Sequence, residues 1–202
     1  MAASSSTAAS PDLSRLGQRL YHKALVRYQN EPIVDPRGNP IGWLLDTRSA
    51  MLESDIFQDV GQVLAGKLRE RGVHQIAGYG YGAFPMVCSV LSGNESDGFR
   101  GGFVREERKP HGRRRLVEGP LERMQPVVLL DDILNSGRSA VKALSLLRGD
   151  GYRVVGLFTL FNFTWGGGRA RMEQEGLWVD SLLDLNLREQ AQSGDRARSK
   201  AE

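Results

Sequence analysis

The residue types best suited to chemistry lie together in one segment, residues 127–140, which reads VVLLDDILNSGRSA. Two adjacent acids, Asp131 and Asp132, follow an apolar run of the kind found in strands that are buried on both faces. Ionised carboxylates only accept hydrogen bonds, so the pair suits sugar hydroxyls or the waters around a magnesium ion. The polar turn 135–139 then offers backbone N–H groups and two hydroxyls at the start of a predicted helix, where the helix dipole favours a phosphate. The segment predicts a site for a phosphorylated sugar; the alternative is that the acids merely cap the next helix.

A second segment, residues 76–86, places glycines at positions 78, 80 and 82 between a predicted strand and a predicted helix. Their spacing does not fit the G-x-G-x-x-G fingerprint of dinucleotide sites. Exposed backbone amides in such a turn suit an anionic ligand. The alternative is a tight turn in which glycine only satisfies the backbone geometry.

Positive charge is concentrated in a third segment. The whole chain has 27 Lys and Arg against 24 Asp and Glu, and this net charge of +3 does not by itself indicate a nucleic-acid binder. Residues 100–115 alone contain seven basic and two acidic side chains. A polar stretch as long as 103–119 inside a compact domain is typical of a functional lid or of disorder. The alternatives are a solvated basic face or an RNA-binding arm, for which Phe103 is the one aromatic residue present.

Helical and strand patterns alternate along the chain. Ser10 is the expected cap of the first helix and Asp55 that of the second. The alternation predicts an α/β fold with a mostly parallel, twisted sheet flanked by helices, in which ligands bind beyond the carboxyl ends of the strands, after residues 78, 130 and 161. The predicted helices cover 11–24, 56–68 and 83–91 and a segment around 141–147, and the predicted strands cover 74–78, 127–130 and 153–161.

Length and composition indicate a single domain. A chain of 202 residues is expected to fold as one unit over residues 11–186, between a flexible Ala- and Ser-rich tail, 1–10, and a flexible charged tail, 187–202. The single cysteine, Cys88, excludes an internal disulfide. No apolar stretch is long enough for a membrane span, and the first ten residues lack the apolar core of a signal peptide, so we expect a cytoplasmic protein that binds no membrane.

The three segments, in their order along the chain, resemble those of type I phosphoribosyltransferases, most closely the orotate phosphoribosyltransferases. Residues 127–140 are similar to the family's acid pair and phosphate turn, and residues 103–119 to its mobile catalytic loop. Residues 76–86 are similar to its pyrophosphate loop, with matches at Gly78, Gly82, Ala83 and Pro85. The resemblance implies a parallel sheet with a small N-terminal helical segment, the hood.

Roles for individual residues follow from this resemblance. It implies that Asp131 and Asp132 contact the ribose hydroxyls of phosphoribosyl pyrophosphate and, with the substrate, a Mg²⁺ ion. The family's loop usually reaches into the partner subunit's site, which implies a homodimer. The implied 5′-phosphate loop is Asn135, Ser136, Gly137, Arg138 and Ser139; the implied pyrophosphate loop includes Tyr81, Gly82 and Ala83; the matching positions of the catalytic loop are Arg105, Lys109, His111, Gly112, Glu118 and Gly119.

The chain departs from the family pattern at several positions. Glu106 stands where the family commonly has a lysine, and Asn135 where it usually has a threonine. After the strand ending near Phe161, the family's Asp-Arg pair, whose arginine helps to hold the base, is absent, and the next cation is Arg169. Phe163 and Trp165 are candidates to stack on an aromatic base, although core packing explains Phe163 equally well.

A weaker similarity covers residues 43–48, WLLDTR, which resemble the tyrosine-rich strand and Asp-x-Arg of the orotate enzymes. Core packing of Trp43 and Leu45 is the alternative explanation.

The resulting prediction is an enzyme that transfers a phosphoribosyl group from phosphoribosyl pyrophosphate to a heterocyclic nitrogenous base, orotate or a related pyrimidine first, and releases pyrophosphate. Two alternatives stay open. One is a non-catalytic regulator that senses phosphoribosyl pyrophosphate and binds nucleic acid, a partner that the sequence does not favour. The other is a phosphoribosyltransferase for a different base in a specialised pathway.

Overall fold

The computed structural model describes residues 12–27, 33–34, 40–93, 95–108 and 115–186. Within this described part, six strands form the central sheet in the order β10-β9-β8-β5-β6-β7. Neighbouring strands are parallel except β6 and β7, which pair antiparallel at one edge. The predicted α/β fold with a mostly parallel sheet is confirmed. The strands are β5 (Gln75–Tyr79), β6 (Arg100–Val104), β7 (Val117–Glu118), β8 (Pro126–Leu134), β9 (Arg153–Phe163) and β10 (Trp178–Leu185).

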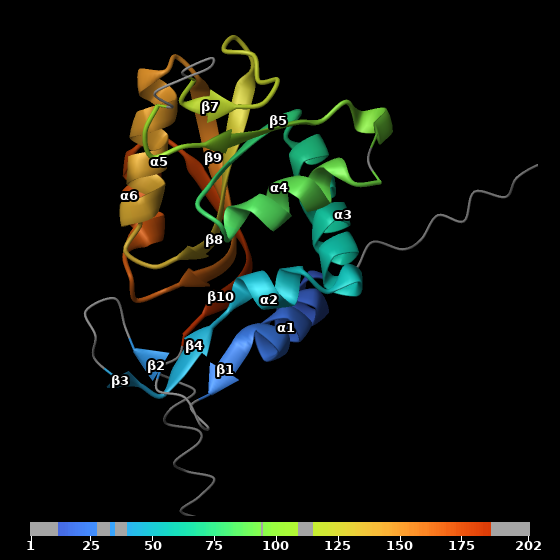
Figure 1. The fold of residues 1–202 in the computed structure, drawn as a ribbon, viewed down its shortest axis with the longest axis vertical. Coiled ribbons are helices and arrows are strands. Elements are labelled where there is room, and N and C mark those ends of the chain that lie inside the picture. Colours follow the sequence, from blue (N-terminus) through green and yellow to red (C-terminus); the bar gives the residue numbers. More distant parts are fainter. Residues whose placement is uncertain (1–11, 28–32, 35–39, 94, 109–114, 187–202) are drawn as a thin grey trace, which may run out of the picture.

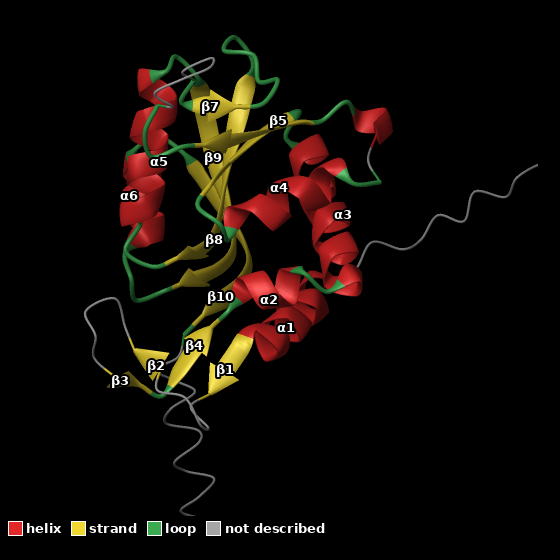
Figure 2. Ribbon diagram, viewed as in Figure 1, coloured by secondary structure: helices red, strands yellow, loops and turns green. Residues whose placement is uncertain are grey.

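Helices cover both faces of this sheet (Figure 1), and the colouring by secondary structure in Figure 2 separates the layers. One face carries α3 (Ser54–Glu70) and α4 (Ala83–Leu91), and the other carries α5 (Arg138–Gly149) and α6 (Gly168–Gln174). A short 3₁₀ helix, Glu95–Asp97, precedes β6. In this three-layer arrangement the acid pair and the turns that follow β5 and β8 lie at the carboxyl ends of the strands.

The apolar run in β8 supplies both cores. Val128 and Leu130 belong to the core under α3 and α4, whereas Val127 and Leu129 belong to the core under α5. All four side chains are fully buried. Since successive side chains of a strand point to opposite faces, a strand between two helical layers must be apolar at every position.

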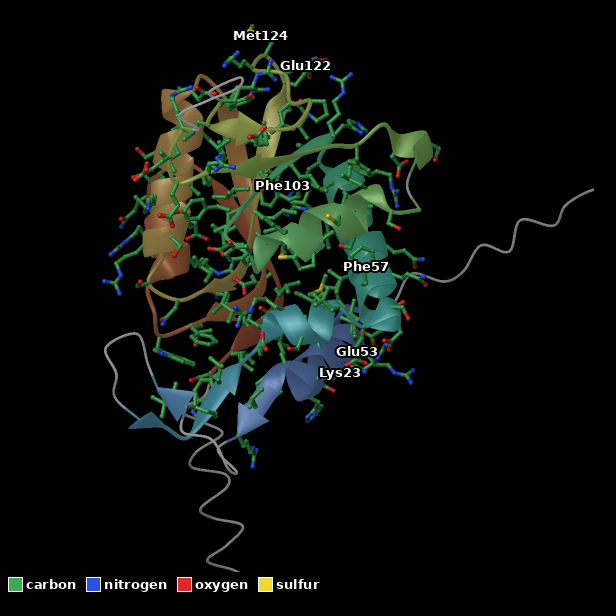
Figure 3. The ribbon with its side chains drawn as sticks, in the orientation of Figure 1. Lys23, Glu53, Phe57, Phe103, Glu122 and Met124 are labelled. Atoms are coloured by element: carbon green, nitrogen blue, oxygen red, sulfur yellow. The ribbon has the colours of Figure 1, made fainter. Side chains whose placement is uncertain are left out.

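The N-terminal segment forms a separate small layer beyond one end of the sheet (Figure 1). It consists of α1 (Leu13–Ala24), β1 (Leu25–Arg27), β4 (Trp43–Leu45) and α2 (Thr47–Met51), with the short pair β2 (Ile33–Val34) and β3 (Pro40–Ile41). β1 pairs antiparallel with β4, and β2 with β3. Lys23 of α1 and Glu53 before α3 form an ion pair that ties this segment, the hood, to the rest of the fold (Figure 3).

Both predicted helix caps differ from the structure. Ser10 lies outside the described residues, and Asp12 caps α1 by accepting a hydrogen bond from the Ser14 backbone N–H at 3.0 Å. Asp55 lies inside the first turn of α3, which has no side-chain cap. Its carboxylate instead accepts a 2.7 Å hydrogen bond from Arg19 of α1, because the neighbouring helix offers a charged donor.

Two strands are longer than predicted, since β8 continues to Leu134 and β9 to Phe163. Their carboxyl ends lie toward the hood, whereas Glu122 and Met124 mark the opposite end of the sheet (Figure 3). None of the helices in the described residues is long and apolar enough to cross a membrane. The predicted tails, 1–10 and 187–202, fall outside the described residues.

Candidate active site

The acid pair lies in the last part of β8, where three chain segments meet. The Thr47 hydroxyl, at the start of α2, donates a 2.5 Å hydrogen bond to Asp132 Oδ2. From the other side, the turn before α4 packs so closely that a Cβ on Gly82 would lie 2.1 Å from the same oxygen. The hood and the glycine turn therefore fix the orientation of the Asp132 carboxylate.

Asp131, like Asp132, is half-buried. The backbone N–H of Asp132 donates to Asp131 Oδ1 at 3.0 Å. Burial, and then the charge of Asp132, raise the pKa of the Asp131 carboxyl well above its ordinary value. Two carboxylates that repel each other in a partly dry site are stabilised by a ligand that donates hydrogen bonds or brings positive charge.

The turn after β8 presents backbone N–H groups at the start of α5. Gly137 adopts a φ of +74°, a left-handed conformation in which glycine carries no steric cost, and no side chain caps the helix. The first N–H groups of a helix have no partner within it. Together with the helix dipole, they make the turn 135–139 suitable for a phosphate.

Two glycines in the connection from β9 to α6, Gly166 and Gly168, pack against the turn 135–139. The Gly168 N–H donates to the Asn135 carbonyl oxygen at 2.8 Å. Added Cβ atoms on Gly166 and Gly168 would lie 2.3 and 2.5 Å from that oxygen. The two glycines thus allow the β9–α6 connection to pack directly on Asn135.

The glycine turn contacts the acid pair and also a large cavity. This cavity has a volume of about 660 Å³ and is lined by residues 79–81 and 103–108 together with Phe84 and Glu118. The acid pair itself does not line it. Since Gly82 lies against Asp132 while Gly80 and Tyr81 line the cavity, the turn separates the acid pair from a space beside residues 103–108.

The first residues of segment 103–119, the predicted catalytic loop, lie along α5. Glu106 pairs with Lys142 of α5 at 3.2 Å and accepts a 3.1 Å hydrogen bond from the Tyr79 hydroxyl. Arg108 pairs with Asp150, at the end of α5, at 2.6 Å. The Lys142 ammonium, and then the Tyr79 hydroxyl, lower the pKa of the Glu106 carboxyl, which keeps this acid ionised.

Of the three residues of this loop that were predicted to be catalytic, Arg105, Lys109 and His111, the structure describes Arg105. It lies at the base of the loop, 3.9 Å from Glu118 of β7, and lines the large cavity. Lys109 and His111 lie outside the described residues.

Three aromatic residues meet where β9 ends against the hood. The rings of Phe163 and Trp165 are stacked, with centroids 4.8 Å apart and an angle of 18° between the planes. Trp43 of β4 meets Phe163 edge-on at 6.4 Å. Leu45 is buried, as its predicted core role requires, but Trp43 is 38% exposed and therefore only partly a core residue.

Metal binding can be judged from the donor set. The described residues contain no cluster of three or more His, Cys, Asp or Glu side chains able to hold a metal. Asp131 and Asp132 nevertheless provide the hard carboxylate oxygens that Mg²⁺ prefers, and this ion commonly takes one or two carboxylates plus substrate phosphates and water. The residues present fit a Mg²⁺ ion that arrives with its substrate.

Sequence reasoning missed Thr47. It singled out the Asp-x-Arg pair of segment 43–48, but in the structure Asp46 caps α2 and also pairs with Arg48 at 3.1 Å. Thr47, which lies between Asp46 and Arg48, is 1% exposed, and its hydroxyl donates a hydrogen bond to Asp132. A threonine in the first turn of a helix gives no local signal that it contacts a strand 85 residues away.

Comparisons with known proteins agree with this geometry. The chain is 31% identical over 189 residues to the orotate phosphoribosyltransferase of Rhodopirellula baltica, covering 90% of this chain and 96% of that protein. It is 30% identical over 189 residues to the orotate phosphoribosyltransferase of a Nostoc species, covering 90% and 91%. No protein-family model matches the chain.

A solved structure shows the same fold. The Mycobacterium tuberculosis orotate phosphoribosyltransferase in complex with 5-phospho-α-D-ribosyl 1-diphosphate superimposes with a TM-score of 0.70 and 23% identity, covering 87% of this chain and 97% of that chain. The architecture is therefore that of the type I phosphoribosyltransferases. At the level of sequence, the chain belongs to the orotate phosphoribosyltransferase family.

Proposed function

We propose that this enzyme transfers the phosphoribosyl group of phosphoribosyl pyrophosphate to a ring nitrogen of a pyrimidine base, orotate first among them, and releases pyrophosphate. The observation that carries the proposal is the continuity of β8 and α5. Asp131 and Asp132 on the strand are followed, five residues after Asp132, by an uncapped helix start with Gly137 in the left-handed conformation. One short segment thus offers acceptors for ribose hydroxyls and donors for a phosphate.

Each predicted site segment has a task in this reaction. The bond between ribose C1 and the pyrophosphate oxygen breaks as the bond from C1 to the base nitrogen forms, so positive charge develops on the sugar and negative charge on the leaving group. Asp131 and Asp132 would hold the ribose, and residues 135–139 its 5′-phosphate. Backbone amides of Tyr81, Gly82 and Ala83 would bind the pyrophosphate, and Arg105, Lys109 and His111 would stabilise its developing charge.

Mg²⁺ is part of this proposal. Asp131 and Asp132 would hold it together with substrate oxygens, and when bound it neutralises charge on the pyrophosphate. Burial, and then the charge of Asp132, raise the pKa of Asp131, and this supports the assignment because a cation beside the pair favours the ionised carboxylates.

We also propose that the protein acts in the cytoplasm as a homodimer, following the family's pattern of loops shared between subunits. Sedimentation equilibrium tests the oligomeric state directly. A single species with the mass of one 22.3 kDa chain would contradict the dimer.

The experiment that tests the function measures pyrophosphate release with phosphoribosyl pyrophosphate, Mg²⁺ and orotate. Asp132→Asn is expected to reduce kcat/KM by about a hundredfold or more, because the charged acceptor is lost while the side chain keeps its shape. Lys109→Ala is expected to lower kcat more than it changes KM.

Circular dichroism and the melting temperature serve to check that both variants fold. Release at the parent rate by Asp132→Asn would show that the acid pair has another role. No turnover with any base, together with nucleic-acid binding that weakens steeply with salt, would favour the regulator instead.

A further inference from the structure

A small cavity lies at the end of the sheet opposite the acid pair, and the proposed reaction does not use it. Its volume is about 170 Å³, and it lies where Arg123 precedes β8 and Tyr152 precedes β9. Glu122 and Met124, the chain neighbours of Arg123, mark this end of the sheet in Figure 3. The cavity is therefore separate from the turn 135–139, which follows the carboxyl end of β8.

Charged side chains dominate the described residues that line this cavity. They are Arg108 after β6, Arg115 before β7, Arg123 before β8 and Asp150 at the end of α5. Three guanidinium groups, which are always charged, and one carboxylate give a net charge of +2 around a small space. A concentration of positive charge of this kind attracts an anionic ligand.

Asp150 holds two of these arginines beside each other. Its Oδ1 accepts a hydrogen bond from Arg108 at 2.6 Å, and its Oδ2 accepts one from Arg123 at 3.4 Å. The Asp150 side chain is 10% exposed, whereas those of Arg108 and Arg123 are 57% and 60% exposed. Since a guanidinium has five N–H donors, the contact with Asp150 uses only part of what each arginine offers.

Arg123 is held in place by further contacts. Its Nε donates to the Asp150 carbonyl oxygen at 2.7 Å, and its guanidinium lies over the Tyr152 ring, 5.3 Å from the ring centroid. Gly151, with a φ of +86°, lies against the same side chain, because an added Cβ would be 3.2 Å from Arg123 Cδ. A guanidinium fixed in this way loses little freedom when an anion binds, which favours affinity.

The size of the cavity indicates the class of ligand. Pockets for drug-sized molecules have volumes of about 300–1,000 Å³. A cavity of about 170 Å³ therefore suits one phosphate group better than a whole nucleotide. Guanidinium groups bind phosphate oxygens through paired N–H donors, and a phosphoryl group carries a charge of about −1.5 to −2 at pH 7, close to the opposite of the cavity's own charge.

We propose that Arg108, Arg115 and Arg123 form a second phosphate-binding site, distinct from the turn 135–139. Its ligand is inorganic phosphate or the phosphoryl group of a larger molecule. Because Arg108 and Arg115 belong to segment 103–119, a phosphate bound there links this segment to the end of α5. The inference goes beyond the proposed function and does not depend on it. The competing explanation is an ion-pair network that only attaches the segment to α5.

The test titrates sodium phosphate into the full chain by calorimetry, at an ionic strength held constant with sodium chloride. Saturable binding is expected in the parent. Arg123→Gln and, independently, Arg108→Gln should weaken it by about tenfold to a hundredfold, because each change removes a charged donor. Arg148→Gln is the matched control. It removes the same charge from the last turn of α5, where Arg148 pairs with Glu175 and does not line the cavity, and should bind phosphate like the parent.

Gly137→Ala separates this site from the phosphate turn of the proposed active site. Alanine is strained at the φ of +74° that Gly137 adopts, so the turn 135–139 is disturbed while the arginine cavity is not. Binding that is lost in Arg123→Gln should persist in Gly137→Ala. Adenosine monophosphate distinguishes the two sources of the ligand. Binding at least about tenfold tighter than that of phosphate, and lost in Arg123→Gln, identifies a larger phosphorylated molecule, and equal or weaker binding identifies free phosphate.

Three results would overturn the inference. The first is the absence of saturable phosphate binding in the parent. The second is parental affinity in both Arg123→Gln and Arg108→Gln, with melting temperatures showing that the variants fold. The third is an equal loss in Arg148→Gln, which would show a general effect of charge. The proposed function is tested separately by pyrophosphate release, so either can fail without the other.

Discussion

The hydroxyl of Thr47 donates to Asp132 Oδ2 at 2.5 Å and so joins the hood to the tip of the central strand. The two residues are 85 positions apart in the chain. Because Asp132 also lies against Gly82, this one carboxylate connects the N-terminal hood, β8 and the glycine turn. The proposed ribose contact is therefore held in place before any substrate binds, which reduces the cost of ordering it during catalysis.

Thr47→Val should weaken substrate binding. Valine keeps the shape of threonine but cannot donate, and a hydrogen bond to a charged group contributes about 1.5–3 kcal/mol. We expect an increase of about tenfold to a hundredfold in the Kd for phosphoribosyl pyrophosphate, measured by calorimetry. Thr47→Ser keeps the donor and is the control. Equal affinity in the parent and in Thr47→Val would mean that the hydroxyl does not orient Asp132.

Gly82→Ala should displace the Asp132 carboxylate. The new methyl group would lie 2.1 Å from Asp132 Oδ2, far inside contact distance, so the carboxylate must move. We expect turnover to fall by about a hundredfold or more with the fold retained, since misplacement by about 1 Å is enough for such a loss. Gly66→Ala is the matched control, because its methyl group would meet nothing closer than Arg69 at 3.9 Å. Parental turnover in Gly82→Ala would argue against Asp132 as a positioned ligand.

Asp131→Asn should stabilise the fold while impairing function. Burial and the charge of Asp132 raise the pKa of Asp131 in the folded state, so the folded protein favours the protonated form. The parent therefore loses stability as the pH rises through this raised pKa, whereas the asparagine variant does not titrate there. Melting temperatures of the two proteins should coincide near about pH 4 and diverge in favour of Asp131→Asn toward about pH 8. A lower melting temperature for the variant at neutral pH would contradict the assigned cause.

Glu106→Gln should release the first part of the catalytic loop from α5. The change removes the charge that pairs with Lys142, while the exposed position leaves global stability nearly unchanged. Trypsin should then cut faster after Arg105 and Arg108 at an unaltered melting temperature. Glu70→Gln, which loses the exposed pair with Lys67 on α3, should leave this cleavage rate unchanged. A cleavage rate equal to the parent's in Glu106→Gln would show that the ion pair does not hold the loop.

Much of the fold could be predicted because its signals are local. An apolar run such as 127–130 requires a strand covered on both faces, and the turn chemistry after it predicts a helix start. β10 and the hood strand β1 were not predicted, since each is held by long-range pairing, as in the register of Leu183 with Phe161. β4 was expected only from the resemblance of residues 43–48 to the family's strand. A strand of three residues such as β1 also carries little intrinsic preference of its own.

The part of the candidate site that could be predicted consists of residues that are neighbours in sequence. Asp131, Asp132 and the turn 135–139 are neighbours in sequence, so their joint chemistry is visible from residue types alone. Thr47 and the aromatic partnership of Trp43 with Phe163 depend on how the hood packs against β9, and no spacing in the chain reports that packing. For Asp55 the local pattern gave a wrong prediction. It suggested a helix cap, but the Asp55 carboxylate forms an ion pair with Arg19 of α1 instead.

The central claim is that the tip of β8 and the start of α5 bind a phosphorylated sugar diphosphate together with Mg²⁺. Calorimetric titration of phosphoribosyl pyrophosphate into the full chain, with and without Mg²⁺, tests it most directly. The account predicts saturable binding that requires the metal, that raises the melting temperature, and that is lost in Asp131→Asn, Asp132→Asn. No heat and no change in melting temperature for the parent, or equal binding by that double variant, would contradict it.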